Sequence, residues 1–470
     1  MIIARVVCDS FVSLQTTLGP ISGLSSSVNI NNVTKYLTVF KKVPFAKPHV
    51  DDLRFRNPVP HGPWNGTLDA ISFVPSCIQQ IRPEAIAYLP NLNQSEDWLP
   101  LYIYVPAGSS TSNKKSVMIW IYGGGFSNGQ GISYDRSYLS VTGDVIVVTI
   151  NYRLNIFGFF APSDGSAAGN YGQWDQRLAI QWVNENIDSF GGDTNSITIF
   201  VESSGWFSVA LHAIIPANRG LFHRVIQQSG TSNSLFSTTR IPHKASDEVA
   251  RVLNCSHNLT TDIMACMRDK HSHDVYNAMQ DFISVVTHDV NFHIVSYFVT
   301  VVYGVLLKEN PIDAIVNHNS SAYDFFKSLD VMIGACESEG SLLADYLFSL
   351  QKHLSFNVSE GISSELLCKH MLPLLANDYY NNDTNIVQTI CKEYSSKGPL
   401  QQQRMKTVDF YGDLFFHSPA VQSLNTHPFN NHKTTQFQYM SRRRPFSFSF
   451  VRTLAMVERN RTWIYRSFFQ

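Results

Sequence analysis

The chain has few charged residues and almost no net charge. Of its 470 residues 16% are charged, and 36 Lys and Arg nearly balance 37 Asp and Glu, which leaves a formal charge of −1 at pH 7. Proteins that bind nucleic acid or anionic membranes by electrostatics have an excess of basic residues. We therefore expect neither nucleic acid nor a charged membrane surface as a partner.

Long apolar runs and metal-binding spacings are also missing. No apolar segment approaches the roughly 18 residues that indicate a transmembrane helix, and the apolar stretch 295–307 is short enough to be core. The chain has seven cysteines, but none in the CxxC or Cys/His spacings of zinc sites. We expect no membrane span, no metal and no cofactor.

The N-terminus is not typical of a secretory signal peptide. In MIIARVVCDSFVSLQ, Arg5 and Asp9 interrupt an apolar run that is already too short. Residues 1–17 are therefore left unassigned, as a remnant of a targeting segment or a misassigned start.

The rest of the chain nevertheless has features of a secreted or extracellular glycoprotein. Nine N-x-S/T sequons lie at Asn32, Asn65, Asn93, Asn254, Asn258, Asn319, Asn357, Asn382 and Asn460. Cys255 and Cys266 lie close together in a hydrophilic stretch, which suits a local disulfide. The other cysteines have no obvious partner: Cys8, Cys77, Cys336, Cys368 and Cys391.

One stretch predicts a reactive serine. Residues 197–205, ITIFVESSG, are a short apolar strand that ends in small residues, and a helical segment follows from Trp206 to Ile215. A serine on a sharp strand-to-helix turn is the geometry of the nucleophile elbow, G-x-S-x-G. The alternative is a plain turn or N-cap serine.

Several other segments favour a parallel α/β sheet. Residues 101–105, 116–122 and 144–151 are expected to be buried strands, and 169–190 a turn followed by an amphipathic helix. The second strand ends in Gly123-Gly124-Gly125, whose backbone N–H groups can turn toward an oxyanion. The alternative is a flexible turn. Asp330 to Ala335 is expected to be a strand with Glu337 and Glu339 just beyond its end, where such sheets place functional groups.

At this level of detail the chain resembles the type-B carboxylesterase and cholinesterase family of α/β-hydrolases. The resemblance runs from about Leu18 to Pro445 and is densest in three segments: VPFAKPHVDDLRFRNPVPHGPWNGTLDA (43–70), VMIWIYGGGFSNG (117–129) and GNYGQWDQRLAIQWVNENIDSFGGDTNSITIF (169–200). It implies an α/β-hydrolase fold, with a large, mostly parallel central sheet and helices on both faces. The domain is expected over 18–445, C-terminally truncated, with a divergent tail over 446–470.

The resemblance also implies a site and a reaction. Ser203 matches the nucleophile, Glu339 the triad acid, and Gly124, Gly125 and the N–H of Ser204 the oxyanion hole. Cys255 and Cys266 match a family disulfide. The implied activity is that of a serine esterase, which hydrolyses a small-molecule carboxylic ester through an acyl-enzyme.

The chain departs from the family near the reacting groups. Val201 replaces the first elbow glycine, which should strain the turn by about 1–3 kcal/mol, and Trp206 replaces a second glycine. Trp98 replaces a cysteine, so Cys77 loses its partner. Tyr88 stands where cholinesterases bind the choline cation through a tryptophan; it is either a weaker substrate-cation contact or an ordinary loop aromatic.

The departure that matters most for activity is the catalytic histidine. The family's His-Gly motif should follow Arg444-Pro445, but none does, and His417, His427 and His432 come too early. The serine should then lose several orders of magnitude in rate. The alternative function is a non-catalytic cell-surface or adhesion protein on the same fold.

A one-base frame shift after about Pro445 would account for the tail. One allowed coding of residues 454–463, read one base later, gives W-P-W-L-N-G-T-E-H-G, which restores His-Gly. The histidine requires the Thr462 codon to end in a. Sequencing the transcript across residues 440–470 is expected to show that codon, and any other threonine codon there rejects the hypothesis.

Overall fold

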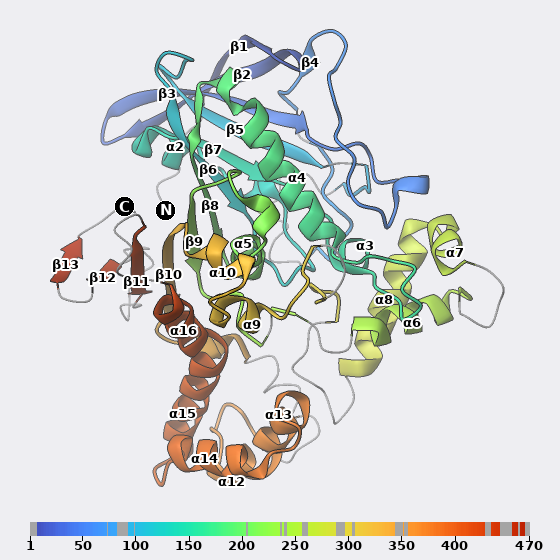
Figure 1. Cartoon of the computed structure of the whole chain (residues 1–470), viewed down its shortest axis with the longest axis vertical. Coiled ribbons are helices and arrows are strands. Elements are labelled where there is room, and N and C mark those ends of the chain that lie inside the picture. Colours follow the sequence, from blue (N-terminus) through green and yellow to red (C-terminus); the bar gives the residue numbers. More distant parts are fainter. Residues whose placement is uncertain are drawn as a thin grey trace.

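One mixed sheet of 13 strands runs through the molecule (Figure 1). The strand order is β1-β2-β3-β5-β7-β6-β8-β9-β10-β11-β12-β13, and β4 pairs with β2. The structure is a computed structural model, and it describes residues 7–72, 74–81, 93–97, 99–203, 205–235, 237–238, 242–255, 262–287, 297–302, 306–343, 351, 356–427, 434–441, 454–458 and 461–465.

The strands are β1 (Val7–Thr16), β2 (Gly19–Ile30), β3 (Val33–Pro44), β4 (Leu68–Asp69), β5 (Pro100–Pro106), β6 (Lys115–Ile121), β7 (Ile146–Ile150), β8 (Gly192–Glu202), β9 (Arg224–Gln228), β10 (Asp330–Cys336), β11 (Gln436–Ser441), β12 (Leu454–Glu458) and β13 (Arg461–Tyr465). The strands predicted at 101–105, 116–122, 144–151 and 330–335 are thus confirmed as β5, β6, β7 and β10.

The α-helices are α2 (Ser137–Gly143), α3 (Asn155–Phe159), α4 (Tyr171–Asn186), α5 (Gly205–His212), α6 (Pro242–Val252), α7 (Ile263–Asp269), α8 (Ser272–Thr287), α9 (Pro311–Val316), α10 (Ser321–Phe326), α12 (Ser364–Leu366), α13 (Leu372–Tyr379), α14 (Thr384–Tyr394), α15 (Leu400–Gly412) and α16 (Ser418–Thr426). Shorter 3₁₀ turns include η1 (Asp51–Leu53), η2 (Gly131–Ser133), η3 (Ile187–Phe190), η4 (Pro216–Asn218) and η5 (Glu339–Leu343), and two π-helical segments are η6 (Leu367–Met371) and η7 (Asp413–His417).

The centre of the sheet is parallel, as predicted. Strands β7, β6, β8, β9, β10 and β11 pair in parallel, whereas β1-β2-β3-β5-β7 and β11-β12-β13 pair antiparallel. The parallel strands are rich in β-branched residues, and all five residues of β7, Ile146–Ile150, are buried. Buried β-branched runs of this kind suit strands that are covered on both faces.

Helices cover the sheet on both faces. The α4 and α5 helices lie across the front in Figure 1, α2 packs against β2, β3, β5 and β7, and α16 packs against β10. The α4 helix is preceded by Asn170, whose backbone is left-handed and whose side-chain amide exchanges two hydrogen bonds with the backbone of Val301. Val301 belongs to the stretch that we expected to be core, and it is buried.

Both ends of the described chain belong to the sheet. Within residues 1–17, for which the sequence predicts no element, Val7–Thr16 is the edge strand β1. The divergent tail contributes β12 and β13, which continue the sheet beyond β11.

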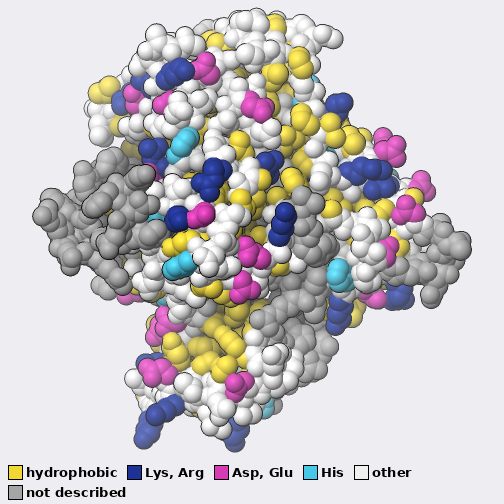
Figure 2. All heavy atoms as spheres, in the orientation of Figure 1, with side chains coloured by type: hydrophobic (Ala, Val, Ile, Leu, Met, Phe, Trp, Pro, Cys, Tyr) yellow, Lys and Arg dark blue, Asp and Glu magenta, His cyan; other side chains and the backbone are white. Residues whose placement is uncertain are grey.

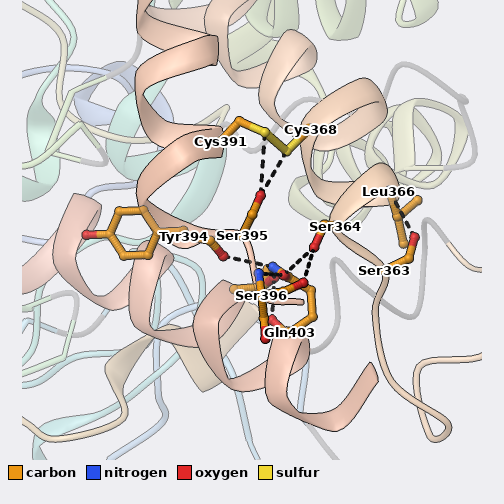
Figure 3. Close-up of a disulfide and its surroundings, with 10 residues drawn as sticks. Ser363, Ser364, Leu366, Cys368, Cys391, Tyr394, Ser395, Ser396 and Gln403 are labelled. Carbon is orange, nitrogen blue, oxygen red and sulfur yellow. Dashed lines mark hydrogen bonds between the residues drawn. A yellow bond between two sulfur atoms is a disulfide. The ribbon is translucent and has the colours of Figure 1, made fainter. Parts of the chain in front are cut away.

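Two disulfides are present among the described residues. The predicted bond between Cys255 and Cys266 is confirmed. A second bond, which the sequence did not reveal, joins Cys368 of η6 to Cys391 of α14 (Figure 3). It connects two segments of the helical layer formed by α12–α15, which lies below the sheet in Figure 1.

Candidate active site

Ser203 lies at a sharp turn between β8 and α5. Its φ angle is +63°, in the left-handed region that residues other than glycine rarely adopt. The backbone N–H of Ser203 still donates to the carbonyl of Gln228 on β9, at 3.2 Å. The chain therefore stays attached to the sheet and reverses within one residue, which is the elbow geometry that the sequence predicted.

Val201 lies two residues before the serine and is completely buried. It has a regular place in the sheet, paired with Ile121 of β6 and Gln227 of β9. The left-handed backbone of the turn thus belongs to Ser203 and not to Val201. The side chain of Trp206 lies outside the described residues.

The predicted site residues lie at one edge of the sheet. A single row of paired residues crosses the parallel strands β6, β8, β9, β10 and β11: Ile121, Val201, Gln227, Ile333 and Gln438. Ser203, Glu339 and the glycines 124 and 125 all follow this row on its carboxyl side. Since neighbouring strands are about 4.8 Å apart, the ends of β8 and β10 are separated by roughly 10 Å.

Glu339 begins η5, three residues beyond the end of β10. One of its carboxylate oxygens accepts a hydrogen bond from the backbone N–H of Cys336 at 2.6 Å. The next residue, Gly340, is buried against α15, where any side chain would run into the carbonyl oxygen of Val408. The carboxylate is thus held at the end of the strand by a tightly packed turn.

The glycine loop follows β6, the neighbour of β8. Gly124 and Gly125 both have positive φ angles, of 121° and 66°. The carbonyl of Gly124 accepts hydrogen bonds from the N–H groups of Ser127 and Asn128, and a side chain at Gly124 would collide with the carbonyl oxygen of Asn128. The loop is therefore a tightly packed turn with internal hydrogen bonds. The third expected donor, the N–H of Ser204, lies outside the described residues.

Two tyrosines pack beneath this loop. Tyr122 and Tyr152 stack with their ring centroids 4.4 Å apart, and each hydroxyl donates to the other's carbonyl oxygen, at 3.2 and 2.9 Å. Both side chains are completely buried, and burial raises the pKa of each phenol. They remain neutral, so they support the end of β6 without adding charge to the site.

Cys77 has no disulfide, as the sequence predicted. Its thiol donates to the carbonyl of Tyr152 at 3.3 Å, and burial raises its pKa to about 12. A buried thiol of this kind is protonated and chemically inert. Two residues singled out in the sequence, Tyr88 and Trp98, lie outside the described residues.

Arg136 is a feature of this region that sequence reasoning missed. Its guanidinium carbon lies 3.9 Å from the centroid of the Trp120 ring and 5.7 Å from that of Phe200. Burial lowers its pKa to about 10, so it stays charged at neutral pH. Because side chains alternate along a strand, Glu202 is on the same face as Phe200. The structure thus puts a half-buried cation near the residue that precedes the serine.

Three described histidines, His212, His417 and His427, have ring nitrogens hydrogen-bonded to partners other than Ser203 and Glu339. His212 lies at the end of α5 and its ring nitrogens lie beside Gln176 and Asn218; burial lowers its pKa to about 3. His427 donates to the carbonyl of Leu329, which precedes β10 and lies at the opposite edge of the sheet from Glu339.

His417 has both ring nitrogens engaged. They lie 3.0 Å from an Asp413 carboxylate oxygen and 2.9 Å from the carbonyl oxygen of Cys336. The ring of His417 therefore links η7 to the end of β10. His432 and the segment after Arg444-Pro445 lie outside the described residues.

Comparison with known proteins identifies the relatives of the chain. A family model described as "Carboxylesterase family" matches residues 10–456. Liver carboxylesterase 1F of Rattus norvegicus is 30% identical over 449 residues, which are 91% of this chain and 75% of the relative. Acetylcholinesterase of Electrophorus electricus is 34% identical over 349 residues, 72% of this chain and 52% of the enzyme.

A third relative, the precursor of the medium-chain fatty acyl-CoA hydrolase of Anas platyrhynchos, is 39% identical over 263 residues. This match covers 54% of the chain and 47% of the relative. The chain therefore spans about half the length of two of these relatives and three quarters of the third.

The left-handed backbone of Ser203 predicts the effect of two substitutions on stability. Ser203→Ala and Ser203→Gly both remove the hydroxyl, but only glycine adopts this φ angle without a steric cost. We expect Ser203→Gly to have a free energy of unfolding about 1 kcal/mol higher than Ser203→Ala, measured by denaturant titration. Equal stability, or a lower value for the glycine variant, would show that the turn is not strained.

Proposed function

The chain belongs to the carboxylesterase family, and we propose that it is a serine carboxylic ester hydrolase whose nucleophile is Ser203. The observation that supports this most strongly is the positive φ of Ser203 at the junction of β8 and α5. Such strain is found where a turn must present a side chain for chemistry. The substrate is a small-molecule ester.

The geometry suggests a role for each group in a two-step acyl transfer. The Ser203 hydroxyl attacks the ester carbonyl, and the N–H groups of Gly124, Gly125 and Ser204 stabilise the oxyanion. A base takes the proton of Ser203 and returns it to the leaving alcohol, and water then hydrolyses the acyl-enzyme. In this scheme Glu339 is the acid that orients the base and stabilises its charged form.

We further propose that this chain is impaired in ester hydrolysis, because the histidine that would serve as the base is missing from its expected position. The His-Gly motif is not in the sequence after Arg444-Pro445, and both ring nitrogens of His417 are already hydrogen-bonded. Without a base, Ser203 attacks only as a weakly nucleophilic hydroxyl, and a loss of about 10³- to 10⁶-fold in kcat follows.

Added imidazole should supply the missing base. With p-nitrophenyl acetate as substrate, we expect slow hydrolysis by the chain that rises with imidazole concentration beyond the buffer blank. The Ser203→Ala variant is the matched control, because it keeps the fold and lacks the hydroxyl, and it should show only the blank rate. An equal response of the two proteins to imidazole would reject Ser203 as the nucleophile.

A non-catalytic binding protein on the same fold is the second candidate. The observation that favours it is the set of histidines, since His212, His417 and His427 all have other hydrogen-bond partners. The imidazole experiment separates the two candidates, because a binding protein needs no reactive serine.

We also propose that the protein is secreted or extracellular. Every sequon asparagine that the structure describes is exposed: Asn32, Asn65, Asn93, Asn254, Asn319, Asn357 and Asn382. Two disulfides, Cys255–Cys266 and Cys368–Cys391, suit an oxidising compartment. In the part of the chain that the structure describes, no helix has the length and apolarity needed to cross a bilayer.

Glycosylation tests this localisation. Expressed in animal cells behind a secretory leader, the chain is expected to migrate more slowly on a gel than its calculated 53.0 kDa. Treatment with an amidase that removes N-linked glycans should restore the calculated mobility. Unchanged mobility before and after treatment would contradict the proposal, and the same chain made in bacteria provides the unglycosylated reference.

A further inference from the structure

A chain of hydrogen bonds links the helical layer formed by α12–α15 to the turn that holds Glu339. It begins at Tyr394 of α14, whose hydroxyl donates to Asp413 at 2.8 Å. The other oxygen of Asp413 lies 3.0 Å from Nδ1 of His417, and Nε2 of His417 donates to the carbonyl of Cys336 at 2.9 Å. The N–H of Cys336 in turn donates to Glu339 at 2.6 Å.

The tyrosine at the start of this chain is held by packing of its own. Tyr394 stacks edge-on against Phe410 with centroids 5.1 Å apart. Burial, and then the hydrogen bond to Asp413, raises the pKa of Tyr394, so its hydroxyl remains a donor. Asp413 and His417 are the first and last residues of the π-helical segment η7, and such segments are frequent at functional sites.

The helical layer is itself anchored by the second disulfide. Cys391 lies one turn before Tyr394 on α14 and is bonded to Cys368 of η6. The hydroxyl of Ser395 lies 3.4 and 3.5 Å from the two sulfurs, and Gln403 of α15 hydrogen-bonds to the Tyr394 carbonyl (Figure 3). The tyrosine end of the chain is therefore fixed to α14, α15 and η6 together.

The other end of the chain is the acid itself. Cys336 is the last residue of β10, and its N–H and carbonyl face Glu339 and His417 respectively. Gly340 rests on the backbone of α15 just before η7 begins, where there is no room for a side chain. A shift of η7 therefore moves the peptide groups that hold the Glu339 carboxylate.

We propose that His417, held by Asp413 and Tyr394, is a positioning residue that orients the Glu339 carboxylate through the backbone of Cys336. This inference rests on the proposed function, since Glu339 needs orienting only if it serves as the triad acid. It gives the π-helical segment and the Cys368–Cys391 disulfide a role in the site. It also gives a role to a histidine that bonds to Cys336, the same residue whose N–H donates to Glu339.

Hydrogen exchange of the full-length protein, followed by mass spectrometry of the peptide covering 330–341, tests whether His417 holds the backbone of Cys336. This test does not require catalysis. In His417→Ala we expect the Cys336 amide to exchange about fivefold faster, the factor that corresponds to one hydrogen bond of typical net strength. His417→Gln, which retains a side-chain N–H donor, should restore most of the protection.

His427→Ala is the matched control. It removes a histidine that makes the same kind of bond, at 2.9 Å, to the carbonyl of Leu329 at the other end of β10. Exchange at Cys336 should not change in this control. Unchanged exchange in His417→Ala, or an equal increase in the control, would overturn the proposal.

A second variant applies if His417→Ala does not fold. Tyr394→Phe removes one hydroxyl and should raise the exchange rate of the Cys336 amide at least twofold. No change in that rate would overturn the proposal.

The imidazole-assisted ester reaction provides the second readout. His417→Ala should lower kcat about tenfold with KM unchanged, because Glu339 is misplaced and the substrate pocket is not. The control His427→Ala should retain kcat. If His417→Ala shows the expected faster exchange at Cys336 but Ser203 reacts in no variant, the proposed function is rejected. The bonds of His417 are then structural contacts. Faster exchange at Cys336 with an unchanged kcat would overturn the positioning role.

Discussion

The parallel pairing of β6, β8, β9, β10 and β11 is the constraint on which the site depends. Because all five strands point the same way and share one register, their carboxyl ends meet at a single edge. The glycine loop, Ser203 and Glu339 all follow strands that end at this edge of the sheet. Gly124 and Glu339 are nevertheless more than 200 residues apart in sequence. A left-handed backbone at Ser203 then lifts one hydroxyl out of the sheet.

Sequence patterns were sufficient for this part of the structure. Buried β-branched runs mark the strands, and small residues after β6 and β8 mark the two turns that carry the proposed nucleophile and oxyanion hole. The features that the sequence did not reveal depend on contacts between distant segments. Cys368 and Cys391 pair because η6 and α14 pack together, and no spacing rule predicts that. Arg136 has no motif, and its contact with Trp120 exists only after the sheet has formed.

The proposed acid, Glu339, and the proposed nucleophile, Ser203, are held in place by different contacts. The acid is fixed by a tight glycine turn and by the chain of bonds through His417, Asp413 and Tyr394. The serine is fixed by its own strained turn. Among the described residues, His417 does not serve as a free base in this arrangement, because both of its ring nitrogens already have hydrogen-bond partners. On the proposed function, the described residues thus hold the nucleophile and the acid in place, and the His-Gly motif that would supply the base does not follow Arg444-Pro445.

The reaction of Ser203 with a fluorophosphonate probe tests this description most directly, because the probe reports the nucleophilicity of the serine without requiring turnover. We expect slow labelling that is confined to Ser203 and is abolished in Ser203→Ala. Rapid labelling of the unmodified chain without added base would contradict the account, because it would mean that another group already takes the proton. Labelling that survives in Ser203→Ala would contradict it as well, because the reactive serine would then lie elsewhere.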